Sequence, residues 1–555
     1  MFRTEKPWVR VYEGRASPET EVYEGSLTDF FRSSVEEHRD KTVITFYGAT
    51  FDFTRLEALS EKMAASLAAC GVKKGDRIAL MLPNCPQYVV SFFASVRLGA
   101  IVTQLNPMYV EREIEHILKD SNAETIVVYS NVYPRVKTVI ERTPLKNVIV
   151  VDLKDEPEGL GAGHTSFGRF VAEDADPAPR VEIDPPEDVA VLQYTGGTTG
   201  VSKGAMLTHR NLIANVQQAL DLFVDDPASF SNNQGVMGVL PMFHIFGLTC
   251  VMLFGIRQGL NQLLLPRFDV DEVLKLVKEH EPVMFSGVPT MYMALNSSGV
   301  DLKEHGFGKV RIYNSGGAAM PINVRRAFEK KTGRPVFEGY GLSEASPVTH
   351  FNPPFMGQGR EGSIGVPIPS TDARIVDVET GSEEMPIGES GELIIKGPQV
   401  MKGYWNMPEE TAETLKDGWL HTGDVARMDE DGYFYIVDRK KDMIVAGGYN
   451  VYPREIEEVL FEHKEVAEAV AIGVLDEYRG ETVKAFVVCK PESGVTEEEI
   501  LAFCKERLAP YKAPKTVEFR DELPKSTVSK LLRRVLTDEE KAKASTTSAS
   551  PQYSG

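Results

Sequence analysis

The segment from Tyr194 to Gly204 carries residue types that suit the binding of a polyphosphate. It reads Tyr-Thr-Gly-Gly-Thr-Thr-Gly-Val-Ser-Lys-Gly and follows an apolar, β-prone run that begins at Val189. Glycines let the backbone turn so that its N–H groups converge on an anion, and Lys203 adds a positive charge. The order differs from the common P-loop, in which a serine or threonine follows the lysine. Taken alone, the segment is either a phosphate-binding loop or a flexible surface loop.

Several later segments combine glycines with charged or hydroxyl residues in the same way. Each has an ordinary explanation in isolation, because a lone loop carboxylate or lysine usually faces solvent. The segments are Asn314–Ala318, Gly339–Glu344, His421–Asp424, Asp438–Asp442, Gly447–Pro453 and Pro524–Lys530.

Taken in this order, the segments resemble the motifs of the adenylate-forming superfamily, which comprises acyl-CoA synthetases, amino-acid adenylation domains and luciferases. The resemblance extends from residue 194 to residue 530 and implies an ATP site. In that site an aromatic ring lies on the adenine, a carboxylate accepts from both ribose hydroxyls, and Mg²⁺ takes oxygen ligands. The implied nucleotide-binding residues are Thr195, Gly196, Gly197, Thr198, Thr199, Gly200, Lys203, Gly316, Gly317, Ala318, Gly339, Tyr340, Gly341, Ser343, Asp424 and Arg439, with Thr195 and Glu344 at the metal.

The resemblance also implies a second step in which CoA attacks the acyl adenylate. Lys441 matches a hinge between a large and a small domain, and Gly448 matches a position beside the pantetheine tunnel. Lys530 matches the lysine that bridges the substrate carboxylate and the α-phosphate, where a cation offsets the charge of an attack of anion on anion. The family usually has glycine before this lysine, whereas this chain has Ser529.

The segment Leu240–Gly247 bears on which carboxylic acid is the substrate, because it resembles a motif that lines the acyl site. His244 in that motif is expected to act in catalysis, as a gate or pocket wall, or else to be an ordinary buried histidine. Gly341 stands where acetate-activating relatives carry a tryptophan, so room is left for a long tail. The segments look most like those of bacterial long-chain fatty acid–CoA ligases, although Leu248 replaces the tryptophan gate of some such enzymes.

Three alternatives to a fatty acyl-CoA synthetase stay open at this point. An aryl or aryl-acrylate CoA ligase would use the same motifs with a differently shaped pocket. A luciferase-type or other acyl-adenylate-forming enzyme would not use CoA productively. A scaffold with a vestigial nucleotide site is the third, and the presence of Lys530, Glu344 and Asp424 argues against it.

The chain around these motifs predicts an α/β fold. Strands and helices alternate, so we expect a large N-terminal domain of two doubly wound α/β subdomains, followed by a small β-rich subdomain from Gly362 to Gly403. The boundaries expected are 1–438 for the large domain, 439–540 for a small mobile α+β domain and 541–555 for a disordered tail. The sequence from Thr54 to Glu57 has the form of a capping box that opens a helix.

The composition of the chain argues against some classes of binding partner. The 555 residues carry a net charge of −20, which disfavours nucleic acid and simple docking on anionic lipid. Five scattered cysteines predict buried thiols in a reducing compartment, and the N-terminus lacks an apolar signal core. We therefore expect a cytoplasmic enzyme that uses a fatty acid, ATP, Mg²⁺ and CoA. A homodimer and a transient peripheral contact with the membrane stay open.

Overall fold

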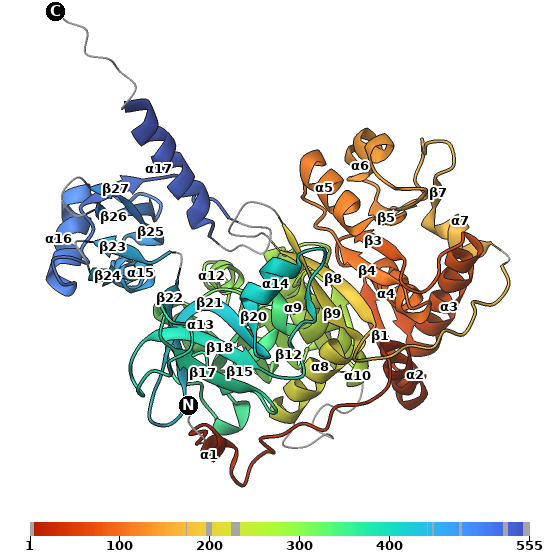
Figure 1. The fold of residues 1–555 in the computed structure, drawn as a ribbon, viewed down its shortest axis with the longest axis horizontal. Coiled ribbons are helices and arrows are strands. Elements are labelled where there is room, and N and C mark those ends of the chain that lie inside the picture. Colours follow the sequence, from red (N-terminus) through yellow and green to blue (C-terminus); the bar gives the residue numbers. More distant parts are fainter. Residues whose placement is uncertain are drawn as a thin grey trace, which may run out of the picture.

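The structure is a computed structural model that describes residues 5–173, 175–195, 202–223, 234–440, 442–446, 449–476, 480–525 and 531–547. It contains two large mixed sheets, a small antiparallel sheet and a C-terminal α+β unit. In Figure 1 the C-terminal unit (blue) lies at one end of the molecule, and helices α2 to α7 with the strands between them (red to orange) lie at the other.

The first large sheet has a parallel interior and an antiparallel edge. Its apolar strands are buried on both faces, as is usual for parallel strands covered by helices. Only β9 and β19 run antiparallel to their neighbours. In spatial order the strands are β19 (Gly403–Tyr404), β9 (Lys203–Thr208), β8 (Val189–Thr195), β4 (Ile101–Gln104), β3 (Arg77–Met81), β5 (Thr125–Tyr129), β6 (Asn147–Val151) and β7 (Thr165–Ser166).

The second large sheet combines two strands from residues 42–52 with seven strands from residues 235–367. Its six central strands are parallel, and the hairpin strand β2 and the strands β15 and β16 form antiparallel edges. In spatial order the strands are β16 (Val366–Pro367), β15 (Val348–Phe351), β14 (Val336–Gly341), β13 (Ile312–Ser315), β12 (Met284–Gly287), β10 (Gly235–Gly238), β11 (Asn261–Leu264), β1 (Thr42–Phe46) and β2 (Ala49–Asp52).

Two five-stranded sheets complete the chain. The small antiparallel sheet contains β17 (Asp372–Val376), β18 (Gly391–Lys396), β21 (Trp419–Met428), β20 (Leu415–Lys416) and β22 (Phe434–Arg439). The C-terminal sheet contains β24 (Tyr449–Val451), β23 (Ile444–Ala446), β26 (Gly480–Cys489), β25 (Val466–Asp476) and β27 (Thr516–Phe519).

Helices cover these sheets, and one hydrophobic core joins the first three of them. That core includes residues of the first sheet, the second sheet and the small sheet, such as Val102, Ile44 and Leu393, whereas the C-terminal unit has separate clusters. The helices are α1 (Val9–Tyr12), α2 (Leu27–His38), α3 (Phe53–Ala69), α4 (Pro86–Arg97), α5 (Glu111–Ser121), α6 (Tyr133–Val139), α7 (Phe167–Ala172), α8 (His209–Phe223), α9 (Ile245–Gly247), α10 (Phe254–Arg257), α11 (Val270–His280), α12 (Pro289–Asn296), α13 (Ile322–Thr332), α14 (Pro408–Thr414), α15 (Pro453–Glu462), α16 (Glu497–Arg507) and α17 (Arg533–Thr547).

Three local expectations are wrong. Helix α3 starts at Phe53, because Asp52 rather than Thr54 caps it and accepts a hydrogen bond from the Arg55 N–H at 2.7 Å. The tail expected from residue 541 is helical through Thr547, as part of α17. Not every thiol is buried either, since Cys70 is exposed at the end of α3.

Within the described part of the chain, no helix is both long enough and apolar enough to cross a bilayer.

Candidate active site

Lys203 begins β9, where its backbone pairs with that of Thr195 at the end of β8. The ammonium group is almost enclosed, with 10% of the side chain exposed, and forms an ion pair with Glu410 of α14. It also lies 5.5 Å from the centroid of the Tyr404 ring. A buried cation needs a counter-charge, and Glu410 supplies one in this structure. A phosphate group would be a second partner for the same ammonium group.

Glu344 lies close to this lysine because the short turn Ser343–Ala345 packs against β9. Tyr404 donates a hydrogen bond from its hydroxyl to Oε1 of Glu344 at 2.7 Å, and burial and this carboxylate raise the Tyr404 pKa. The backbone of Glu344 accepts from the Met401 N–H at 2.8 Å. Among the described residues, no three His, Cys, Asp or Glu side chains gather into a metal site. One fixed carboxylate beside a hydroxyl residue suits Mg²⁺ that takes its other ligands from phosphates.

Tyr340, Asp424 and Arg439 form a second polar group, built from two sheets. Asp424 on β21 lies opposite Arg439 on β22, and its Oδ1 is 3.2 Å from Nε of the arginine. Tyr340 on β14 donates its hydroxyl to Oδ2 of Asp424 at 2.5 Å. Burial, followed by the charge of Asp424, raises the Tyr340 pKa, so the phenol stays a donor. The carboxylate is thereby fixed as an acceptor for sugar hydroxyls.

Tyr340 also lines a pocket with about 670 Å³ of space, part of which is open solvent. Its lining includes Gly316 and Gly317 from the loop after β13, and Gly339, Tyr340 and Gly341 from β14. The rest of the lining is largely apolar: Ala219, Leu222, Phe246, Thr249, Cys250, Phe254, Met284, Asn314, Ser315, Pro347, Val348 and Phe351.

Two glycines of the pocket lining could not be replaced by a larger residue without strain. An added Cβ at Gly341 would lie 2.3 Å from the backbone oxygen of Pro347, so a side chain there requires a backbone shift. Gly317 has a φ of 78°, which favours glycine. Ala318, the next residue, is partly buried and is not among the residues that line the pocket.

His244 caps α9 instead of lining the pocket. Its Nδ1 accepts a hydrogen bond from the Phe246 N–H at 3.2 Å, and the pocket wall is formed by Phe246 itself. The following stretch from Leu248 to Leu253 is π-helical and supplies Thr249 and Cys250 to the lining. A catalytic role for His244 therefore stays a prediction, and the contacts shown here are those of a residue that positions Phe246.

Comparison with known proteins agrees with this geometry. Residues 31–405 match the family described as AMP-binding enzyme, and residues 455–530 match the AMP-binding enzyme C-terminal domain. The chain belongs to the AMP-binding enzyme family. It is 44% identical to a long-chain-fatty-acid–CoA ligase of Bacillus subtilis over 97% of this chain and 99% of the relative. It is 42% identical to one of Escherichia coli, over 93% and 95%. Among solved structures, ATP-bound MatB from Rhodopseudomonas palustris superposes with a TM-score of 0.83 at 31% identity, over 93% and 99% of the two chains.

Part of the site predicted for this AMP-binding enzyme lies outside the described residues. This holds for the tip of the phosphate loop, the hinge, the pantetheine position and the bridging lysine. The residues concerned are Gly196, Gly197, Thr198, Thr199, Gly200, Lys441, Gly448 and Lys530. The structure brings together Thr195 with Lys203, Ser343 with Glu344, and Tyr340 with Asp424 and Arg439.

Two residues of this enzyme's site were missed by the sequence reasoning. Tyr404 contacts Glu344 and lies over Lys203, and Glu410 pairs with Lys203. Tyr404 belongs to a short strand of only two residues, β19, which no periodic pattern marks, and Glu410 follows that strand. One chemical signal for Glu410 was available, because a buried lysine requires an acidic partner. Glu410, near the start of α14, is one of several acids in the chain that could have met this requirement.

Proposed function

We propose that this AMP-binding enzyme activates a fatty acid of medium to long chain. It forms acyl-AMP from the acid and ATP with release of pyrophosphate, and it then transfers the acyl group to CoA. The observation that carries the proposal is the largely apolar pocket that Gly339, Tyr340 and Gly341 line together with buried side chains such as Leu222, Phe254 and Met284. The two bacterial relatives bear the name of this reaction.

The chemistry requires activation because the oxygen of a free carboxylate is a poor leaving group. We assign Lys203 to the terminal phosphates, Tyr340 to the adenine, and Asp424 with Arg439 to the ribose. Mg²⁺, with oxygen donors from Thr195 and Glu344, would screen the phosphate charge. Lys530 would lie between the substrate carboxylate and the α-phosphate, where a cation lowers the repulsion between two anions.

The acyl chain would lie against Phe254, Met284 and Leu222, which are apolar and belong to the pocket lining. Each buried methylene contributes about 0.8 kcal/mol of binding free energy. Gly341 belongs to the same lining and adds no side chain to it. These contacts favour an apolar tail and supply no counter-charge for an α-amino group.

The second half-reaction is assigned from the sequence motifs. Rotation of the small domain about Lys441 would withdraw Lys530 and present Gly448 to the pantetheine of CoA. No residue is assigned as a base for the thiol.

We further propose a cytoplasmic enzyme whose contact with membranes is transient. The net charge of −20 opposes lasting attraction to anionic lipid. Analytical ultracentrifugation would distinguish a homodimer from a monomer, and co-sedimentation with vesicles would measure the membrane contact.

A panel of carboxylates tests the proposal. Pyrophosphate release is measured for fatty acids of increasing length, 4-hydroxycinnamate and several amino acids, each with and without CoA. We expect turnover with CoA for the longer fatty acids. Preference for the cinnamate would identify an aryl-acrylate ligase, and full turnover without CoA would identify an enzyme that only forms adenylates. Either result contradicts the proposed function.

A further inference from the structure

Glu338 is the buried residue directly before the Gly339–Tyr340 motif, and its side chain has no place in the roles assigned so far. It lies within β14, paired in register with Ser315, the last residue of the parallel strand β13. Only 3% of the residue is exposed. The chain leads from these two residues into parts of the pocket lining, which are Gly316 and Gly317 after β13 and Gly339, Tyr340 and Gly341 in the rest of β14.

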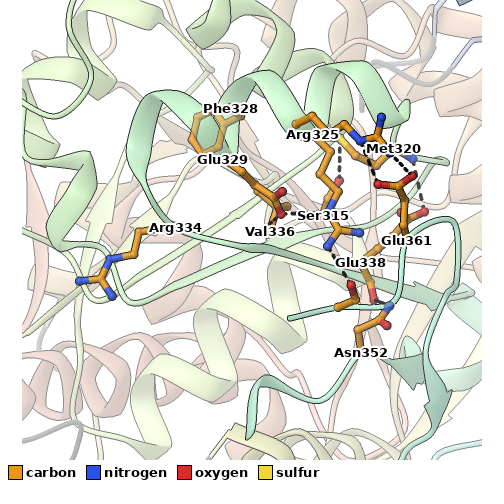
Figure 2. Close-up of polar contacts among 12 residues, drawn as sticks. Ser315, Met320, Arg325, Phe328, Glu329, Arg334, Val336, Glu338, Asn352 and Glu361 are labelled. Carbon is orange, nitrogen blue, oxygen red and sulfur yellow. Dashed lines mark hydrogen bonds and ion pairs between the residues drawn. The ribbon is translucent and has the colours of Figure 1, made fainter. Parts of the chain in front are cut away.

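The Glu338 carboxylate contacts the far end of the loop that follows β13. Its Oε1 accepts a hydrogen bond from the backbone N–H of Met320 at 3.3 Å (Figure 2). Between Ser315 and Met320 lie Gly316 and Gly317, which line the pocket. The loop is therefore attached to the second sheet at both of its ends, by the strand β13 and by this one side chain.

The backbone of Glu338 is fixed independently. Its carbonyl oxygen accepts from both the N–H and the Nδ2 of Asn352, at 3.1 and 2.9 Å. Neighbouring β15, which carries on into Asn352, also pairs with Gly339 and Tyr340. The carboxylate thus extends from a strand whose backbone is held on both sides, and it accepts its hydrogen bond from Met320 at the end of the glycine loop.

We propose that the Glu338 side chain is a positioning residue that holds the Gly316–Met320 loop against β14 and so sets the separation between the two walls of the adenylate pocket. The proposal rests on the adenylate site of the proposed function and adds a residue to it. Gly316 and Gly317 have no side chains with which to hold their own position. The Gly316 N–H donates to the Gly287 carbonyl at 3.2 Å at the near end of the loop, and Glu338 holds the far end through Met320.

The charge state of Glu338 supports this assignment. Burial raises its pKa to about 7, against the opposing effects of Arg454 on α15, the Met320 N–H and Arg325 on α13, while Glu458 on α15 adds to the increase. The folded protein therefore holds this proton more tightly than the unfolded chain. Stability from the group is present at acid pH and is lost as the pH rises through about 7. The anion that forms is also the stronger acceptor from Met320.

Two substitutions separate tethering from packing. Glu338→Gln keeps an acceptor of the same shape without a charge, and Glu338→Met keeps the volume and removes the acceptor. The matched control is Glu361→Gln, which removes an exposed acid from the same region (Figure 2). Glu361 pairs with Arg326. AMP is the probe, and its dissociation constant is measured by calorimetry at pH 6 and pH 8 together with the melting temperature.

We expect the Met variant to bind AMP about fivefold more weakly than the wild type at pH 6, and the Gln variant to match the wild type there, since a neutral hydrogen bond contributes on the order of 1 kcal/mol. Between pH 6 and 8 the wild type should gain affinity relative to the Gln variant. The melting temperature of the Met variant should equal or exceed that of the wild type at pH 8, because no carboxylate is then buried.

Equal AMP affinity in the wild type and the Met variant would overturn the proposal. So would a parallel pH dependence of the wild type and the Gln variant, and this comparison decides the matter even if the Met variant does not fold. AMP binding without pyrophosphate release on any fatty acid would reject the proposed substrate and leave the role of Glu338 standing.

Discussion

Neutralising Glu410 is expected to destabilise the free enzyme and to tighten its binding of ATP. Lys203 is buried, and Glu410 is the acid that compensates its charge. In the Glu410→Gln variant the ammonium group keeps its desolvation cost and loses its ion pair. A phosphate group then becomes a better partner for Lys203 than it is in the wild type, where the carboxylate competes for the same ammonium group and repels the incoming anion.

The magnitude follows from the exposure of the two side chains. Breaking a fully buried ion pair costs about 3–5 kcal/mol. Lys203 is 10% exposed and Glu410 is 33% exposed, so solvent screens part of the interaction. We therefore expect a cost of roughly 1–2 kcal/mol in the free protein, which corresponds to ATP binding tightened by about 5- to 30-fold if the phosphate restores the lost attraction.

Calorimetric titration with Mg²⁺-ATP measures the affinity, and a thermal scan of the free protein measures the stability. Glu409→Gln is the matched control, because the residue lies on the same helix, carries the same charge and is exposed. Weaker ATP binding in Glu410→Gln than in Glu409→Gln would refute the reasoning, since it would mean that Glu410 holds Lys203 in place for the phosphate rather than competing with it.

Three other outcomes are expected. Gly341→Ala should reduce kcat/KM for long fatty acids more than tenfold, because its Cβ would lie 2.3 Å from the Pro347 oxygen, whereas Gly494→Ala, with open space around it, should change nothing. Tyr404→Phe removes the hydroxyl that donates to the Glu344 carboxylate. This change should raise the Mg²⁺ concentration needed for half-maximal pyrophosphate release about fivefold, and ATP affinity in the absence of metal is the control. Lys530→Ala should abolish adenylation while supplied acyl-AMP is still converted to acyl-CoA, and an equal loss of both half-reactions would contradict the two-step assignment.

Much of the fold was predictable because apolar periodicity and turn residues are local signals. The apolar, β-prone run that begins at Val189 is found as β8, and the expected alternation of strands and helices is found in the first large sheet and its helices. Sheet membership was not predictable in the same way. The N-terminal strands β1 and β2 join the second sheet next to β11, more than two hundred residues away in the chain, and no local pattern specifies that pairing.

The site shows the same division between local and distant information. Tyr340, Glu344 and Asp424 were predicted because each belongs to a short motif with its own order of residues. Tyr404 and Glu410 were not predicted, because their roles exist only once β19 pairs with β9. The role of Glu338 could not be predicted for a further reason. Its position next to the Gly339–Tyr340 motif can be read from the sequence, but its contact with Met320 depends on the fold of a loop.

The contacts within the site also explain why its residues are so widely separated in sequence. Lys203 and Tyr404 belong to the first sheet, Tyr340 and Glu344 follow from the second, and Asp424 lies in the small sheet. Two tyrosine hydroxyls join these units: Tyr404 donates to Glu344, and Tyr340 donates to Asp424. Of the two acceptor carboxylates, Glu344 is assigned to Mg²⁺ and Asp424 to the ribose. Since each bond links two sheets, a ligand that engages either carboxylate acts on the relative position of those sheets as well as on one side chain.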